Sequence, residues 1–238
     1  MGSKGKSIAV MQPYVFPYLG YFQLIQAVDE FVFYDDVNFI KRGWINRNRI
    51  LTHNSEKLIS FPCKKASQNK LINEVILNTD SKDYSKIKET IRHSYKKAPN
   101  FKIVFELIEN ILDKSHNSIS DLATDSIISI SKYLGLNTRF SLSSVEFPET
   151  KNLERAERIM TIVLKLNGDN YVNSIGGVEL YNKNEFLKSD IKLNFLEPTL
   201  SKYKQFNNNF IEGLSVIDVL MFNSKEETLQ LIKNFKLL

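Results

Sequence analysis

The chain has 238 residues, of which 42% are hydrophobic and 25% are charged, a composition typical of a folded globular protein. One cysteine excludes an intrachain disulfide and a cysteine-rich zinc site. With only three histidines we expect no His/Cys metal site, although ligation by carboxylates stays open. No apolar run approaches the roughly 18 residues of a membrane span. No signal peptide is recognisable either, so we expect a cytoplasmic protein.

The net charge of +5 is unevenly distributed along the chain. Residues 1–100 carry 16 Lys and Arg against 9 Asp and Glu, whereas residues 101–238 carry 16 against 18. An anionic partner is therefore expected to bind the first part of the chain. A lysine-rich solvated surface is the alternative interpretation.

Residues 7–36 predict a βαβ unit. Ser7–Met11 and Phe31–Tyr34 are short apolar runs typical of buried strands, and residues 21–28 between them have helical periodicity. A strand, a helix and a strand within about 30 residues indicate parallel pairing with a right-handed crossover.

The rest of the chain continues this alternation. Strands are expected at residues 58–62, 75–77, 139–143, 170–173 and 192–195, and helices at 84–97, 101–112, 118–134, 152–166, 184–188, 215–222 and 225–235. The pattern predicts an α/β fold: an open, mostly parallel, Rossmann-like sheet with helices on both faces and a central helical lobe. We expect an N-terminal part at residues 7–82 and the lobe at 83–136. Residues 137–238 would complete the domain begun by the first part.

The loop after the first predicted strand is rich in aromatic residues. Its candidates for substrate binding are Gln12, Tyr14, Tyr18, Gly20 and Tyr21. The tyrosines offer faces and hydroxyls for a base or a sugar, and glycine at a helix start lets a ligand approach the backbone. An aromatic plug at the sheet edge explains the same residues.

Asp35 and Asp36 follow the second predicted strand, where doubly wound sheets bind their ligands. Either carboxylate can serve as a general base, a magnesium ligand or a ribose-binding group. Adjacent residues of an extended chain point to opposite sides, so we expect only one of the two to face the site. A turn-forming or capping pair is the alternative.

The segment of residues 41–49 interleaves cations with the chain's single tryptophan. Its candidates are Lys41, Trp44, Asn46, Arg47 and Asn48, and Lys65 after the next strand extends the basic wall. Arginine and lysine bind phosphates, and tryptophan stacks on rings. Alternation places Arg47 and Arg49 on one side of an extended chain, opposite the asparagines. The alternative is a solvated edge strand protected by its charges.

Two further features complete the candidates. Gly176, Gly177 and Tyr181 form a turn that either lines a sugar or nucleotide pocket or only reverses the chain. Cys63, beside Lys64, is either a nucleophile with a lowered pKa or a small buried hydrophobic residue, and the second role is commoner.

These motifs together resemble the WbqC-like protein family. The resemblance covers nearly the whole chain from Ile8 and rests on residues 11–14, 16–22, 34–37, 43–48, 64–66, 95–99 and 214–220, with Gly176, Gly177 and Tyr181. Such proteins are encoded among bacterial O-antigen and capsule genes. The resemblance implies a transferase of polysaccharide biosynthesis that passes an acyl or aminoacyl group, such as glycyl, to the amine of a nucleotide-linked amino sugar.

Within that hypothesis, Asp35 or Asp36 takes a proton from the attacking amine, and Asn46 or a backbone amide stabilises the oxyanion. No resident cofactor is indicated. The donor candidates are acyl-CoA and aminoacyl-tRNA, both anionic, and a homodimer is left open.

Two other functions compete with this one. The strand, the Pro17–Tyr21 segment at a helix start, and the second strand with its Asp resemble HIGH-type nucleotidyltransferases, which would use ATP and Mg²⁺. Where those enzymes have histidine, this chain has Tyr18 and Tyr21. The third function is non-catalytic binding of a sugar nucleotide.

Overall fold

The computed structural model describes residues 5–52, 55–206 and 209–238. The described residues form a central six-stranded sheet in the order β5-β2-β1-β6-β7-β8. The strands are β1 (Ser7–Met11), β2 (Glu30–Phe33), β5 (Arg139–Leu142), β6 (Asn170–Ser174), β7 (Lys192–Pro198) and β8 (Phe235–Leu237). Neighbouring strands are parallel, and only the β7–β8 pair is antiparallel. The open, mostly parallel α/β fold predicted from the sequence is confirmed.

The N-terminal βαβ unit is also confirmed. Helix α1 (Leu19–Gln26) joins β1 to β2, and the two strands pair in parallel from Ile8 with Glu30 to Met11 with Phe33. The helix begins two residues before its predicted start, because its N-cap is Tyr18.

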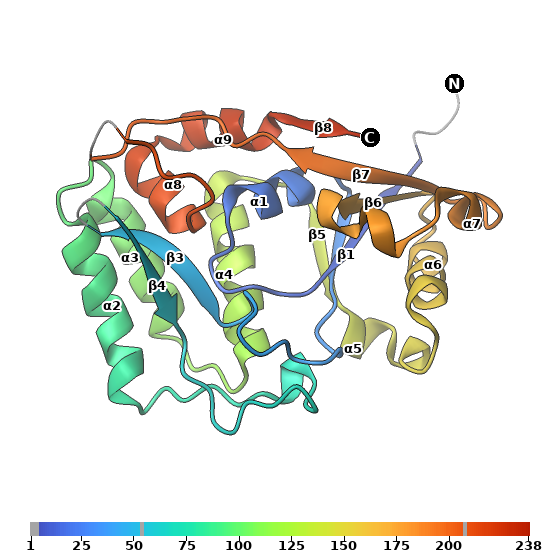
Figure 1. Ribbon diagram of the computed structural model, residues 1–238, viewed down its shortest axis with the longest axis horizontal. Coiled ribbons are helices and arrows are strands. Elements are labelled where there is room, and N and C mark those ends of the chain that lie inside the picture. Colours follow the sequence, from blue (N-terminus) through green and yellow to red (C-terminus); the bar gives the residue numbers. More distant parts are fainter. Residues whose placement is uncertain (1–4, 53–54, 207–208) are drawn as a thin grey trace.

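Alternate residues of the strands belong to two apolar cores that lie on opposite faces of the sheet. Ala9 and Phe31 belong to the core shared with α1 and the central helices. Ile8 and Val32 belong to the core shared with α6 (Arg155–Lys165) and α7 (Lys183–Leu187). Figure 1 shows α2 and α3 at the left and α6 and α7 at the right, with β1 and β5 between them. Helices therefore cover both faces, as the pattern of both strands requires.

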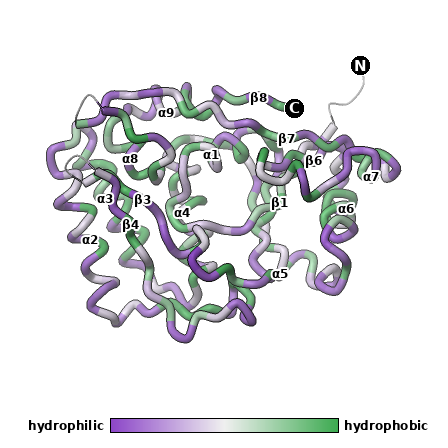
Figure 2. The backbone as a smooth tube through the Cα atoms, in the orientation of Figure 1, coloured by the Kyte–Doolittle hydropathy of each residue, from purple (hydrophilic) through white to green (hydrophobic). Residues whose placement is uncertain are grey.

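The central helices are α2 (Lys82–Tyr95), α3 (Phe101–Leu112) and α4 (Ile119–Leu134). Ser118 and Asp121 form a capping box at the start of α4, and Gly135 ends it in the left-handed conformation with φ of 77°. The apolar faces of these helices share one core with residues of the sheet. Figure 2 shows hydrophobic colour concentrated along α4 and α8, and hydrophilic colour along the outer turns of α2.

A separate hairpin pairs β3 (Arg47–Thr52) with β4 (Ser55–Ser60), and β4 overlaps the strand predicted at residues 58–62. Asn48 and Ile50 are buried, whereas Arg47 and Arg49 are half-buried. This alternation confirms that the two arginines share one side. The edge strand given as the alternative interpretation of this segment is thus present at Arg47–Thr52, with one of its two faces partly open to solvent.

A buried hydrogen-bond cluster ties this hairpin to the helices. The Tyr95 hydroxyl on α2 accepts from the backbone N–H of Leu51 and donates to Asp218 at 2.8 Å. Tyr203 and Gln205 donate to the other carboxylate oxygen of Asp218 at 2.6 and 2.7 Å. Burial raises the pKa of Asp218 above its ordinary value, because the desolvation of its charge outweighs the opposing effect of the three hydrogen bonds.

Two expected elements differ in the structure. The predicted strand at residues 75–77 is wrong: Ile76 and Leu77 make only isolated bridges, to Ser118 and Cys63, after a 3-10 turn at Ile72–Glu74. The last predicted helix is shorter, because α9 (Lys225–Lys233) ends at Asn234 and the chain continues as edge strand β8.

The other described elements are α5 (Ser143–Glu146), α8 (Val216–Phe222) and the 3-10 turns η2 (Pro148–Thr150) and η3 (Ile175–Leu180). Among the described residues, no helix has the length and apolar character needed to cross a membrane.

Candidate functional site

A cavity of about 790 Å³ lies at the carboxyl ends of β1, β2 and β6. In open α/β sheets this is the edge at which ligands bind. Its chemically active lining residues are Gln12, Tyr34, Asp36, Lys151, Asn152, Arg155, Arg158, Asn173, Ser174, Gly176, Gly177 and Tyr181. The sequence predicted this edge as the site, and predicted Gln12, Asp36, Gly176, Gly177 and Tyr181 among its residues.

Asp36 and Arg158 form a buried ion pair in the cavity wall. The Arg158 Nη2 lies 2.6 Å from Asp36 Oδ2, and both side chains are only 3% exposed. The Nε of Arg158 donates to the Thr150 hydroxyl at 3.0 Å, and the Ser143 hydroxyl donates to Asp36 Oδ1. Asp36 therefore receives one donor on each oxygen, and two of its roughly four acceptor positions have no donor among the described residues.

Asp35 is not among the residues that line the cavity, and three donors bind its carboxylate. Its Oδ1 accepts from the backbone N–H of Ser144 at 3.0 Å. Its Oδ2 accepts from the Ser144 hydroxyl at 2.6 Å and from Asn73 Nδ2 at 3.3 Å. Three of the roughly four acceptor positions are occupied, so Asp35 holds the start of α5 to the end of β2. Only one of the two aspartates faces the cavity, as the alternation of an extended chain predicts.

Tyrosine rings and cations complete the cavity wall. The Arg158 guanidinium lies 4.6 Å from the centre of the Tyr34 ring, a cation–π contact. Burial raises the pKa of Tyr34 despite the lowering effect of Arg158. Burial likewise raises the pKa of Tyr181, so both hydroxyls keep their protons near neutral pH and can donate to a ligand. Arg155 and Lys151 bring further positive charge to the same wall.

The glycine turn after β6 approaches the cavity closely. A Cβ added to Gly177 would lie 2.2 Å from Asn173 Nδ2, whereas one added to Gly176 would meet no atom nearer than 4.0 Å. Gly177 is therefore required for Asn173 to keep its position in the wall, and Gly176 is not.

The aromatic loop is divided between this cavity and a smaller hollow. Gln12 lines the cavity, and its backbone carbonyl accepts from the Tyr21 hydroxyl at 2.8 Å. Tyr21 itself is buried in the core. Gly20 is covered by the ring of Tyr18, which a Cβ at Gly20 would approach to 2.5 Å. Gly20 thus makes room for a side chain of the protein instead of leaving its backbone open to a ligand.

The smaller hollow, of about 230 Å³, is lined by Tyr14, Pro17, Tyr18, Trp44, Asn48, Arg49, Leu200 and Gly213. The structure thus brings together four of the predicted binding residues, Tyr14, Tyr18, Trp44 and Asn48, but separately from Asp36.

The remaining residues of the basic segment do not line the cavity. Asn46 Nδ2 donates to the Phe61 carbonyl at 2.9 Å, and Arg47 Nε donates to the Gly43 carbonyl at 3.0 Å. Lys41 and Lys65 are exposed. Among the described cations, those that do line it are Lys151, Arg155 and Arg158, from the half with the lower net charge.

Sequence reasoning missed these three cations and Tyr34, Asn152 and Asn173. The available signals were the position of Tyr34 directly before Asp35, and Arg155 with Arg158 at helical i, i+3 spacing. The second signal is weak, because such spacing is common on solvated helices.

Cys63 does not have the chemistry of a nucleophile. Burial raises the pKa of its thiol to about 12, and its sulfur lies 3.6 Å from the Phe61 carbonyl. Of the two interpretations, the small hydrophobic residue fits. Within the described residues, no group of three or more His, Cys, Asp or Glu side chains has the arrangement needed to hold a metal ion.

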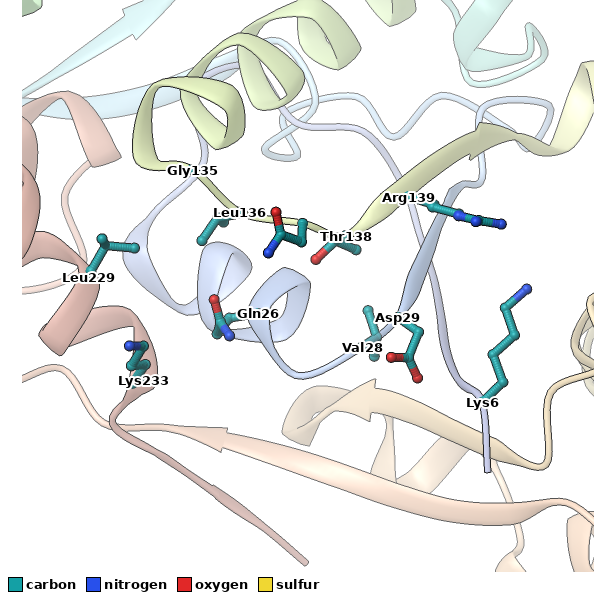
Figure 3. A pocket seen from close by; sticks show the side chains of 11 residues that line it. Lys6, Gln26, Val28, Asp29, Gly135, Leu136, Thr138, Arg139, Leu229 and Lys233 are labelled. Atoms are coloured by element: carbon teal, nitrogen blue, oxygen red, sulfur yellow. The ribbon is translucent and has the colours of Figure 1, made fainter. Parts of the chain in front are cut away.

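Another hollow, of about 770 Å³, lies at the opposite edge of the sheet, where β1, β2 and β5 begin. Figure 3 shows Lys6, Asp29 and Arg139 at one end of it and Lys233 at the other. Lys6 Nζ is paired with Glu30 at 2.7 Å, and the backbone N–H of Ser7 donates to Asp29 at 2.8 Å. Helices α1, α4 and α9 end at this hollow, so their carbonyl ends disfavour an anion there.

A family model describes the chain over residues 12–230 as the WbqC-like protein family, and the chain belongs to this family. The similarity predicted from its motifs is thereby confirmed. An uncharacterized protein of Mycobacterium tuberculosis (strain ATCC 25618 / H37Rv), Rv1507c, is 29% identical over 223 residues, covering 92% of this chain and 94% of the relative. No solved structure gives a significant match.

Proposed function

We propose that this protein transfers an acyl or aminoacyl group to the amine of a nucleotide-linked amino sugar. The observation that supports this function is the cavity at the carboxyl edge. It combines a carboxylate with open acceptor positions, Asp36, with the cations Lys151 and Arg155. Its volume of about 790 Å³ lies within the range of roughly 300–1000 Å³ typical of ligand pockets.

Each wall of the cavity suits one part of such an acceptor. Lys151 and Arg155 bind the diphosphate, because charge-assisted hydrogen bonds to phosphate are the strongest available. Tyr34 and Tyr181 bind the sugar or the base through their rings and hydroxyls. Asp36 accepts a hydrogen bond from the amine, and Arg158 fixes the position of that carboxylate.

The transfer step requires one base and one oxyanion donor. The amine nitrogen attacks the carbonyl carbon of the donor, and the bond from that carbon to the leaving sulfur or oxygen breaks. Asp36 takes the proton that the amine loses and returns it to the leaving group. Asn173, which lines the cavity, replaces Asn46 as the proposed amide donor to the oxyanion, because Asn46 donates to a backbone carbonyl outside the cavity.

Mass spectrometry of a dTDP- or UDP-linked amino sugar, incubated with the protein and candidate donors, tests the function. The expected product has the mass gain of one acyl or aminoacyl group. Binding of the sugar nucleotide without any product over all donors would instead favour the non-catalytic function. Calorimetry with ATP and Mg²⁺ tests the nucleotidyltransferase alternative.

The two aspartates provide a matched pair of variants for the same assay. Asp36→Asn should lower turnover by about a hundredfold or more, the usual contribution of a general base. Asp35→Asn, at the neighbouring buried position, should retain turnover in the fraction that folds. Circular dichroism checks the fold of both proteins. Full activity of Asp36→Asn would refute the role of Asp36.

A further inference from the structure

Two short segments of the chain connect the aromatic hollow with the proposed acceptor cavity. Two segments of the chain border both: Gln12 lines the cavity and Tyr14 the hollow, while Ile40 lines the cavity and Trp44 the hollow. The second segment is a tight turn in which the Gly43 N–H donates to the Ile40 carbonyl at 3.1 Å. A ligand in the hollow is therefore next to a substrate in the cavity.

The walls of the hollow suit a planar ring. Its volume of about 230 Å³ lies below the range of roughly 300–1000 Å³ typical of whole ligands, so it suits one part of a larger molecule. Tyr14, Tyr18 and Trp44 supply aromatic faces, and the Arg49 guanidinium lies 5.7 Å from the centre of the Trp44 ring. An aromatic platform beside an arginine is the arrangement that stacks nucleic-acid bases.

Asn48 and Trp44, which both line the hollow, differ in how far the protein itself uses their side chains. Asn48 is fully engaged, because its Nδ2 donates to the Phe16 carbonyl at 2.6 Å and its Oδ1 accepts from the Arg49 N–H. Trp44, by contrast, is 47% exposed although it is the chain's single tryptophan. The exposed indole contributes little to the core, so a stacking role explains its place better than packing does.

Exposed cations gather on the loops that flank the hollow and the cavity. Lys41 and Arg42 follow Ile40, and both are exposed. The loop ending at Lys70 lies beside this turn, because the Phe39 N–H donates to the Lys70 carbonyl at 2.8 Å. That loop carries the exposed Lys65. The charge excess of the first 100 residues thus borders the two hollows, where it can bind phosphates.

We propose that the aromatic hollow binds the adenine ring of the acyl donor, and that the turn carrying Lys41 and Arg42 binds the donor's phosphates. The proposal rests on the proposed function for the identity of the ligand as a donor. Coenzyme A and the 3′ end of a charged RNA share this chemistry, since both carry an adenosine with phosphates. With the adenine in the hollow, the acyl group is carried toward the amine held at Asp36.

Fluorescence of Trp44 tests the proposal without any turnover, because no other tryptophan contributes. Adenosine 3′,5′-bisphosphate should quench the emission in a saturable way, and ribose 5-phosphate, which has no base to stack, should quench it much less. Coenzyme A and a short RNA ending in CCA are then titrated separately, and the one that quenches at lower concentration is the source of the adenosine. Equal quenching by ribose 5-phosphate, or none by any adenosine compound, would overturn the proposal.

Calorimetry on variants supplies a readout independent of fluorescence. Trp44→Ala should weaken binding of adenosine 3′,5′-bisphosphate by about tenfold or more, the effect of losing one stacking platform. Trp44→Phe keeps a stacking ring and should bind within about threefold of the natural protein, while Lys233→Ala at the opposite edge should bind normally. Unchanged binding by Trp44→Ala would contradict the proposal.

The two proposals fail in different ways. Adenosine binding without acyl transfer would remove the proposed function and keep the adenosine site. Acyl transfer without any effect of adenosine compounds on Trp44 fluorescence would keep the proposed function and remove the adenosine site.

Discussion

The two edges of the sheet carry hollows of nearly equal size, about 790 Å³ at the carboxyl edge and 770 Å³ at the amino edge. Their chemistry differs. At the amino edge, Lys6 and Asp29 are already engaged by the protein, and three helices end with their carbonyl groups toward the hollow. At the carboxyl edge, Asp36 retains open acceptor positions beside Arg155, and glycine lets the backbone come close.

The comparison shows that volume alone does not locate a site in this fold. Strand direction decides which edge presents side chains from several parallel strands to one ligand. The hydrogen-bonding positions and charges of those side chains that the protein does not itself use then decide what can bind there. The predictions below test this difference between the edges.

The largest effect is expected from breaking the ion pair of the carboxyl edge. Arg158→Met leaves the buried Asp36 without its cation and should lower the free energy of unfolding by about 3–5 kcal/mol. Lys6→Met at the amino edge should lower the free energy of unfolding by less, because the Lys6 side chain is 31% exposed and its ion pair is partly hydrated. Urea unfolding measures both variants.

A double variant controls for this interpretation. Asp36→Asn combined with Arg158→Met removes both charges and should recover part of the lost stability. Equal losses in the single and double variants would show that packing of Arg158, and not its charge, stabilises the edge.

Ligand binding should distinguish the edges by charge. Arg155→Ala should weaken binding of a dTDP- or UDP-linked amino sugar by about tenfold or more, since it removes a charge-assisted contact to the diphosphate. Lys233→Ala, at the amino edge, should leave the affinity unchanged. Isothermal calorimetry measures both, and the reverse order would move the site to the amino edge.

The two neighbouring glycines sharpen the description of the cavity wall. Gly177→Ala would place its Cβ 2.2 Å from Asn173 Nδ2, so the Asn173 side chain must shift. Binding of the nucleotide-linked amino sugar should then weaken by about tenfold. Gly176→Ala has open space, with its nearest neighbour at 4.0 Å, and should bind normally. Equal affinities in the two variants would show that the position of Asn173 is unimportant for binding.

The smallest effect is expected at Cys63. Its pKa of about 12 means that alkylation by iodoacetamide should remain slow at pH 8 and accelerate only as the pH rises toward 12. Below that range the thiol is protonated and unreactive. Cys63→Ala should keep the proposed transfer activity within about twofold, whereas loss of that activity in the folded variant would place a thiol in the reaction.

Much of the fold was predictable from local pattern. The apolar runs at Ser7–Met11 and Phe31–Tyr34, with a helix between them, predict the parallel pairing that the structure shows. The hairpin strand at Arg47–Thr52 was not predictable in the same way, because its polar residues face solvent on one side and only Asn48, Ile50 and Leu51 are buried. The bridges at Ile76 and Leu77 were mistaken for a strand because a short apolar run has no period of its own.

The sequence by itself determined the parallel pairing of the N-terminal βαβ unit, the edge at which the candidate site lies, and the placement of an aspartate pair at that edge. These features depend on local periodicity and on the order of elements. Only the tertiary structure decided that Asp36 lines the cavity while Asp35 is bound by three donors of the protein. It also decided that Arg158, 122 positions further along the chain, supplies the cation. Such pairings depend on how α5 and α6 pack against the end of β2, and packing between distant segments leaves no periodic signal in one sequence.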